Sequence, residues 1–93
     1  MIKSTRDAET EKVIHRRFSR RLPADIQQVA YRKLRMVNNA HRLDDLRIPP
    51  AHRLEKLSGD RSSQYSIRIN DRWRVCFAWR EGDAYDVEIV DYH

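Results

Sequence analysis

The last three residues of the chain carry side chains that can exchange protons. Asp91, Tyr92 and His93 follow the apolar run VEIV, which is typical of a buried strand. An imidazole titrates at about pH 6.5, so it can act as an acid or a base near neutral pH. The free carboxylate of His93 and the nearby Asp91 both favour the protonated ring. We therefore expect His93 to act as a general acid.

The reaction that such an acid suits is cleavage of RNA. A ribose 2′-hydroxyl attacks the adjacent phosphorus, a base takes its proton, an acid protonates the leaving 5′-oxygen, and a cation stabilises the phosphorane. Arg74 lies early in a predicted strand, and antiparallel pairing would bring it beside the end of the last strand. The loop RLEKLSGDR, residues 53–61, can reach the same place. The histidines and Cys76 show no metal-ligand spacing, so we expect no metal and no cofactor.

The same residues also allow a purely structural interpretation. A terminal histidine is commonly a solvated tail, and arginines on an exposed strand face commonly do no more than keep a domain soluble. Tyr92 could pack at the edge of the sheet, and Cys76 is expected to pack inside a strand. The other histidines, His15, His41 and His52, are expected at the surface.

Two helices are predicted in the first half of the chain. Residues 7–21 favour a first helix, which Asp7 caps and which turns Val13, Ile14 and Phe18 toward the core. A second helix begins near Pro23, an accepted residue of a first helical turn. Its apolar stripe consists of Ile26, Val29, Ala30, Leu34 and Val37. The segment LDDLRIPP, residues 43–50, is expected to form a turn or a short helix.

From Gln64 the hydrophobic period changes to two, which predicts three strands in QYSIRIN, RWRVCFAWR and AYDVEIVDYH. Short joins between them favour an antiparallel meander. One face is expected to pack on the helices through Tyr65, Ile67, Ile69, Trp73, Val75, Phe77, Trp79, Tyr85, Val87 and Ile89. The other face should display Arg68, Arg74 and Arg80 to solvent. The predicted fold is α+β, a single domain over residues 1–93 with two N-terminal helices packed on a twisted antiparallel sheet.

Composition favours a polyanionic partner. The formal net charge is +5, and fifteen of the nineteen cationic residues are arginine, whose planar fork grips phosphate through two hydrogen bonds. The alternative is that this charge only confers solubility. A single cysteine excludes an internal disulfide, the first residues are too charged for a secretory signal, and no apolar run approaches the roughly 20 residues of a membrane span. We expect a cytoplasmic protein without a membrane partner.

Two segments, HRLEKLSGDRSSQYSIRINDRWRVCFAW and VEIVDYH, together resemble the HigB-type branch of the RelE-like toxins of bacterial type II toxin–antitoxin systems. The resemblance covers nearly the whole chain. It implies a microbial RNase fold and metal-independent endonucleolytic cleavage of mRNA in the ribosomal A site, which inhibits translation. It also implies a HigA-type helix-turn-helix antitoxin as partner, through which alone the toxin contacts operator DNA.

Roles carried over by position follow from this resemblance. Arg74 resembles the phosphate-stabilising arginine of the family, and the terminal triplet Asp91, Tyr92 and His93 resembles its catalytic and substrate-contacting residues. Some relatives carry a histidine and a lysine where this chain has Glu55 and Ser58. Glu55 is therefore a candidate base, and Lys56 a candidate displaced cation. The expected RNA contacts are Lys56, Arg61, Arg68 and Arg72. The alternative is a catalytically weak or silent basic module that binds RNA or the ribosome and acts mainly in antitoxin binding and operon autoregulation.

Overall fold

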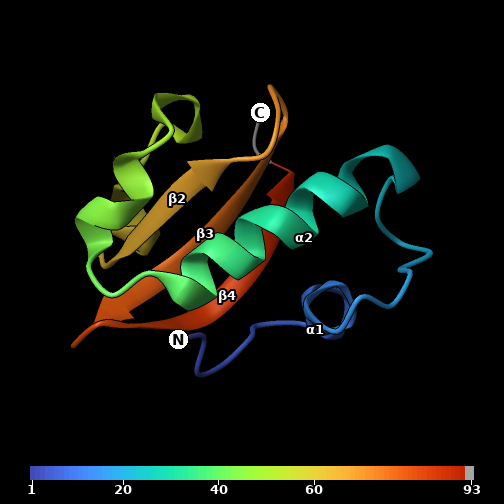
Figure 1. Ribbon diagram of the computed structural model, residues 1–93, viewed down its shortest axis with the longest axis horizontal. Helices are drawn as coiled ribbons and strands as arrows, with labels where there is room; N and C mark the ends of the chain where they lie inside the picture. Colours follow the sequence, from blue (N-terminus) through green and yellow to red (C-terminus); the bar gives the residue numbers. More distant parts are fainter. Residues whose placement is uncertain (92–93) are drawn as a thin grey trace.

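The computed structural model describes residues 1–91, in which two α-helices precede an antiparallel sheet. The α-helices are α1 (Ala8–Ile14) and α2 (Ala24–Asn39), and the short 3₁₀ helices are η1 (Leu43–Arg47), η2 (Pro50–His52) and η3 (Gly59–Arg61). The strands are β1 (Glu55–Lys56), β2 (Gln64–Arg68), β3 (Trp73–Arg80) and β4 (Asp83–Asp91), paired in the order β1-β2-β3-β4. Figure 1 shows α2 lying across the sheet, with α1 beside it on the same side. The predicted α+β fold is confirmed.

Helix α2 forms as its apolar stripe predicted. Ile26, Ala30, Leu34 and Val37 recur at helical spacing, and each is at most 3% exposed. They pack against the helix-facing side of the sheet, where the fully buried residues include Ile67, Val75, Phe77 and Val87. This stripe is what holds the helix over β3 and β4 (Figure 1).

Helix α1 is shorter than predicted. Asp7 caps it as expected, since its carboxylate accepts a hydrogen bond from the amide of Thr10. The helix ends at Ile14, however, and Arg16 has a φ of +60°, in the left-handed region. The predicted continuation to residue 21 is wrong because the segment beyond Ile14 has almost nothing to bury. Its one large apolar residue, Phe18, is 65% exposed rather than in the core.

A β-bulge in β4 changes which residues face the helices. Cys76 pairs with Glu88 but Ala78 pairs with Tyr85, so β4 carries one extra residue between these pairs. Asp86 has a φ of +53° at this point. The shift places Ala84 in the core and Tyr85 on the other face, which corrects the prediction that Tyr85 would share a face with Val87. The guanidinium of Arg80 stacks on the Tyr85 ring there.

Both edges of the predicted three-stranded meander are covered. The two residues of β1 pair with Ser66 and Tyr65 of β2. The N-terminal segment runs beside β4, where the amide of Lys3 donates to the carbonyl of Ala84. Two residues are too few for a hydrophobic period to reveal, so β1 was not predicted. The strand matters because it carries the covering segment, residues 53–61, back onto the face of the sheet that lies away from the helices.

Candidate active site

Arg74 is buried on the sheet face that lies away from the helices. The residue is 8% exposed. Its Nε donates to Ser66 Oγ over 2.7 Å, and its Nη2 donates to the backbone carbonyl of Arg53 over 2.7 Å. The prediction that Arg74 is displayed to solvent is therefore wrong. Strand alternation assigned its face correctly but did not reveal that residues 53–61 fold over it.

Arg68, the arginine opposite Arg74 on the neighbouring strand, points toward solvent instead. Arg68 and Arg74 stand directly opposite each other on β2 and β3, where two like charges destabilise a sheet if they meet. Arg68 instead makes an ion pair with Asp71, whose side chain is 99% exposed. One guanidinium therefore turns outward to solvent and the other inward to fixed acceptors.

Glu55 lies beside the buried guanidinium. It pairs with Ser66 across β1 and β2, so it shares the face of Arg74. Its Oε2 lies 4.0 Å from Arg74 Nη2, and its side chain is 56% exposed. A carboxylate open to solvent next to a fixed cation can accept a proton from a group that the cation holds. The prediction that residues 53–61 lie close to Arg74 is confirmed. Lys56 pairs with Tyr65 and so starts from the opposite face.

The end of β4 arrives at the same corner of the sheet. Val90 is opposite Arg74, and Asp91 is opposite Trp73, as antiparallel pairing predicted. Asp91 accepts two hydrogen bonds from Arg72, Nε to Oδ1 and Nη2 to Oδ2, both of 2.8 Å. The hydrogen bonds and charge of Asp91 raise the pKa of the Arg72 guanidinium. The structure thus pairs Asp91 with Arg72 rather than with Arg74. The other two predicted terminal residues, Tyr92 and His93, lie outside the described residues.

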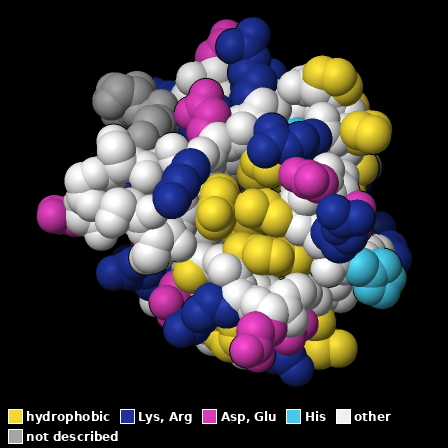
Figure 2. Space-filling view, turned by 90° about the vertical axis from the view of Figure 1, so that its left-hand side faces the viewer, with side chains coloured by type: hydrophobic (Ala, Val, Ile, Leu, Met, Phe, Trp, Pro, Cys, Tyr) yellow, Lys and Arg dark blue, Asp and Glu magenta, His cyan; other side chains and the backbone are white. Residues whose placement is uncertain are grey.

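Arg61 fastens the covering segment to the sheet. Its Nη1 donates to Glu88 Oε1 and to Gln64 Oε1, each over 3.1 Å. Cys76 is buried nearby, and burial raises the pKa of its thiol, in keeping with the packing role expected for it. Of the predicted RNA contacts, Arg61, Arg68 and Arg72 each carry an acidic partner. Figure 2 shows the side of the molecule that lies on the left in Figure 1, where cationic and acidic side chains are interspersed around a hydrophobic patch.

Sequence reasoning missed Ser66 and mistook His52. A serine within a strand has no pattern that marks it as an acceptor for an arginine on the next strand. His52 was expected at the surface but is fully buried. Its Nδ1 bonds to the carbonyl of Leu46, its Nε2 has no partner within residues 1–91, and burial lowers its pKa. In the same range, no three His, Cys, Asp or Glu side chains gather as metal ligands, and no helix is long and apolar enough to cross a membrane.

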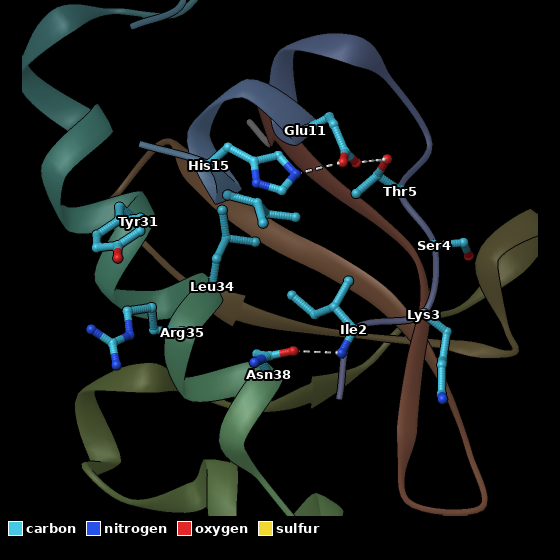
Figure 3. A pocket seen from close by; sticks show the side chains of 11 residues that line it. Ile2, Lys3, Ser4, Thr5, Glu11, His15, Tyr31, Leu34, Arg35 and Asn38 are labelled. Atoms are coloured by element: carbon cyan, nitrogen blue, oxygen red, sulfur yellow. Dashed lines mark hydrogen bonds and ion pairs between the residues drawn. The ribbon is translucent and has the colours of Figure 1, made fainter. Parts of the chain in front are cut away.

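A groove follows the seam between α1 and α2 on the other side of the sheet. One hollow of about 370 Å³ lies between the N-terminal segment and both helices (Figure 3). Ile2, Ile14 and Leu34 line it, and Glu11 there accepts hydrogen bonds from Thr5 and His15. A second hollow of about 280 Å³ adjoins it, and Tyr31 lines both.

Comparison with known proteins yields one family and several relatives. The family model for the "RelE-like toxin of type II toxin-antitoxin system HigB" matches residues 6–93. Toxin HigB-1 of Vibrio cholerae serotype O1 is 40% identical over 65 residues, which span 70% of this chain and 68% of that protein. Endoribonuclease HigB of Proteus vulgaris is 30% identical over 94 residues, the full length of both chains.

Solved structures support the fold. YafQ from Escherichia coli strain BL21(DE3) superimposes with a TM-score of 0.60 over 98% of this chain and 91% of that one, at 11% sequence identity. A point mutant of YafQ gives the same values. At this low sequence identity, the structural similarity is evidence only for the arrangement of helices and strands.

Proposed function

The chain belongs to the HigB family of RelE-like toxins of type II toxin–antitoxin systems, and from this premise we propose that it is an endoribonuclease that cleaves mRNA in the ribosomal A site without a metal ion. Cleavage there would inhibit translation. A full-length relative carries the name endoribonuclease. The observation that supports the proposal best is the distance of 4.0 Å between Glu55 Oε2 and Arg74 Nη2, at the corner where β4 ends.

In the proposed reaction the 2′-oxygen forms a bond to phosphorus and the bond from phosphorus to the 5′-oxygen breaks. Glu55 takes the proton of the 2′-hydroxyl, and His93 gives a proton to the leaving 5′-oxygen. Arg74 holds the non-bridging oxygens, which gain charge in the transition state. The products are a 2′,3′-cyclic phosphate and a 5′-hydroxyl. Each acid or base should contribute about 10²- to 10⁴-fold.

The ribosome should supply what the small enzyme lacks. Three of the predicted RNA contacts, Arg61, Arg68 and Arg72, are already bound to acids. Contacts to phosphates carry no sequence information and weaken with salt. A ribosome presents the message already positioned, and such orientation can supply several kcal/mol. We expect rapid cleavage of translated mRNA and poor cleavage of naked RNA, and equal rates on both would reject this part of the proposal.

The test is induction of the protein in a bacterial host, with mapping of mRNA 5′ ends. Wild type should generate new ends within translated frames, and His93→Gln should not, although it should fold and bind its antitoxin. The alternative of a silent binding module rests on Glu55 and Ser58, which replace the histidine and lysine of some relatives. That alternative predicts that His93→Gln still inhibits translation.

A type II toxin has an antitoxin as partner, and we infer a HigA-type helix-turn-helix protein that provides the only contact of the complex with operator DNA. Its docking surface on this chain is the α1–α2 groove. The two hollows follow α2 from Gln27 to Asn38, a rise of about 16 Å at about 1.5 Å per residue. Phe18 is 65% exposed beside the groove.

Charge indicates the chemistry of the segment that binds there. Arg16, Arg17, Arg20 and Arg21 surround Phe18 in sequence, and none of them makes an ion pair with another residue of the described range. An acidic, amphipathic segment would place apolar side chains in the groove and carboxylates on this rim. Phe18→Glu should weaken antitoxin binding and leave cleavage of translated mRNA intact. Unchanged antitoxin affinity would exclude this surface.

A further inference from the structure

The guanidinium of Arg74 is held by acceptors that take no part in the proposed reaction, two of them at short distance. Ser66 Oγ accepts from Nε and the Arg53 carbonyl accepts from Nη2, each over 2.7 Å. A guanidinium has five N–H donors in one rigid plane. Two fixed points on such a plane define its orientation. Within residues 1–91, Nη1 has no hydrogen-bond partner, so its donors remain for a phosphate.

We propose that Ser66 is a positioning residue, whose hydroxyl sets the orientation in which Arg74 offers Nη1 to the scissile phosphate. This inference rests on the proposed function, because it assumes that Arg74 contacts the reacting phosphodiester. Ser66 does not touch the substrate in this scheme. It acts through Arg74.

The place of Ser66 in the sheet explains why a small hydroxyl residue stands there. Ser66 lies between Glu55 on β1 and Cys76 on β3, and it is fully buried. Arg74 is two residues from Cys76 on the same face, a diagonal neighbour that a long side chain can reach. A buried hydroxyl without a partner is unfavourable, and the Nε donor of Arg74 removes that cost.

The second acceptor is fixed by the backbone. Arg53 has a φ of +46°, in the left-handed region, and follows directly on the 3₁₀ turn η2. That turn ends at His52, which is fully buried and bonded to the carbonyl of Leu46. The Arg53 carbonyl therefore stays in place when Ser66 is changed. Without the Ser66 hydroxyl the guanidinium is held through Nη2 alone, by the Arg53 carbonyl over 2.7 Å and the Ser66 carbonyl over 3.5 Å. A plane held through one nitrogen can pivot, and a displacement of about 1 Å at a reacting group can cost roughly 10²-fold in rate.

The test compares Ser66→Ala with Ser19→Ala. Ser19 is an equally buried serine on the helix side of the sheet, where its hydroxyl donates to Glu9. Cleavage of mRNA on programmed ribosomes should show kcat lowered by about 10- to 100-fold for Ser66→Ala, with KM nearly unchanged. Ser19→Ala should keep the wild-type kcat. Ser66→Cys fills the same space with a weak acceptor and should lose kcat in the same direction, so the inference stays testable if the alanine variant does not fold.

A second readout follows the guanidinium itself. In ¹⁵N-labelled protein carrying His93→Gln, the buried Nε–H of Arg74 should give a slowly exchanging NMR signal. Ser66→Ala should make that signal exchange fast, and Ser19→Ala should not. Loss of kcat with an unchanged Arg74 signal, or an unchanged kcat, overturns the inference.

Failure of the proposed function has a different signature. If Arg74→Met, which removes the charge, cleaves at the wild-type rate, Arg74 has no part in the reaction and the proposed mechanism fails, whatever Ser66→Ala does. If Arg74→Lys abolishes cleavage while Ser66→Ala cleaves normally, only the positioning role of Ser66 is rejected.

Discussion

Arg74 should stabilise the folded protein as well as serve cleavage. Its side chain is only 10% exposed, and it satisfies the hydroxyl of Ser66 and the carbonyl of Arg53. In Arg74→Met both acceptors lose their donor, at about 1–3 kcal/mol for each buried group. The buried methionine offsets part of this loss. We expect a net decrease of about 2–4 kcal/mol in the free energy of unfolding, and a smaller one for Arg74→Lys, which can still reach one acceptor.

Thermal unfolding followed by circular dichroism measures this decrease. For a domain of this size, about 1 kcal/mol shifts the midpoint by roughly 4–8 °C. Arg74→Met should therefore unfold roughly 8–30 °C below its parent. All proteins in the series carry His93→Gln, which removes the proposed acid and allows them to be produced without toxicity.

Arg68→Met is the matched control. Arg68 stands opposite Arg74 on the next strand, but its only ion pair within residues 1–91 is with the exposed Asp71. An exposed pair of this kind contributes about 0–1 kcal/mol, so the control should lose at most a few degrees. If Arg74→Met unfolds at the same temperature as Arg68→Met, the hydrogen bonds of the buried arginine do not stabilise the fold and our reasoning is refuted.

Three further predictions concern other groups. Burial lowers the pKa of His52. Below about pH 6.5 the unfolded chain therefore binds a proton that the folded chain does not. As the pH falls through this range, the free energy of unfolding should decrease by at most about 1.4 kcal/mol per pH unit. His52→Leu should reduce the pH dependence of the unfolding midpoint between about pH 5 and 7, whereas a substitution of the exposed His41 should not. Glu55→Gln should slow cleavage by about 10²- to 10⁴-fold with little change in the midpoint, and an unchanged rate would exclude Glu55 as the base. Arg72→Asp should slow cleavage because it breaks the pair with Asp91. The added change Asp91→Arg should restore the rate, and no recovery would show that cleavage does not depend on this pair.

The parts of the fold that sequence predicted are those with a sustained hydrophobic period. The stripe of α2 runs from Ile26 to Val37 at one spacing, and it fixed both the helix and its buried face. The end of α1 has no such signal, because residues 15–21 are compatible with a helix until the left-handed Arg16 interrupts it. The bulge at Asp86 could not be predicted from the sequence either, because one extra residue in β4 leaves the hydrophobic alternation on both sides of it unchanged.

The sequence predicted where the candidate site lies in the sheet, but not which residues cover it. Antiparallel pairing alone brings Arg74 to the end of β4, and the register bears this out. Alternation says which face a side chain takes, but it cannot say what covers that face. The cover here is a two-residue strand and a 3₁₀ turn, both below the length at which periodicity appears. For the same reason the burial of His52 carried no signal in the sequence.

Residues 53–61 do three things at this corner of the sheet. They provide the Arg53 carbonyl that holds Arg74, they carry Glu55 to within 4.0 Å of it, and Arg61 binds them to Glu88. A guanidinium in water would be free to turn, whereas one beneath this cover is oriented before the substrate arrives. The arrangement also removes Arg74 from the open surface. A protein with a net charge of +5 then offers RNA fewer free arginines on this face than its sequence suggests. With fewer free arginines, this face is better suited to mRNA that the ribosome holds in place than to RNA captured from solution. This is the physical argument for dependence on the ribosome.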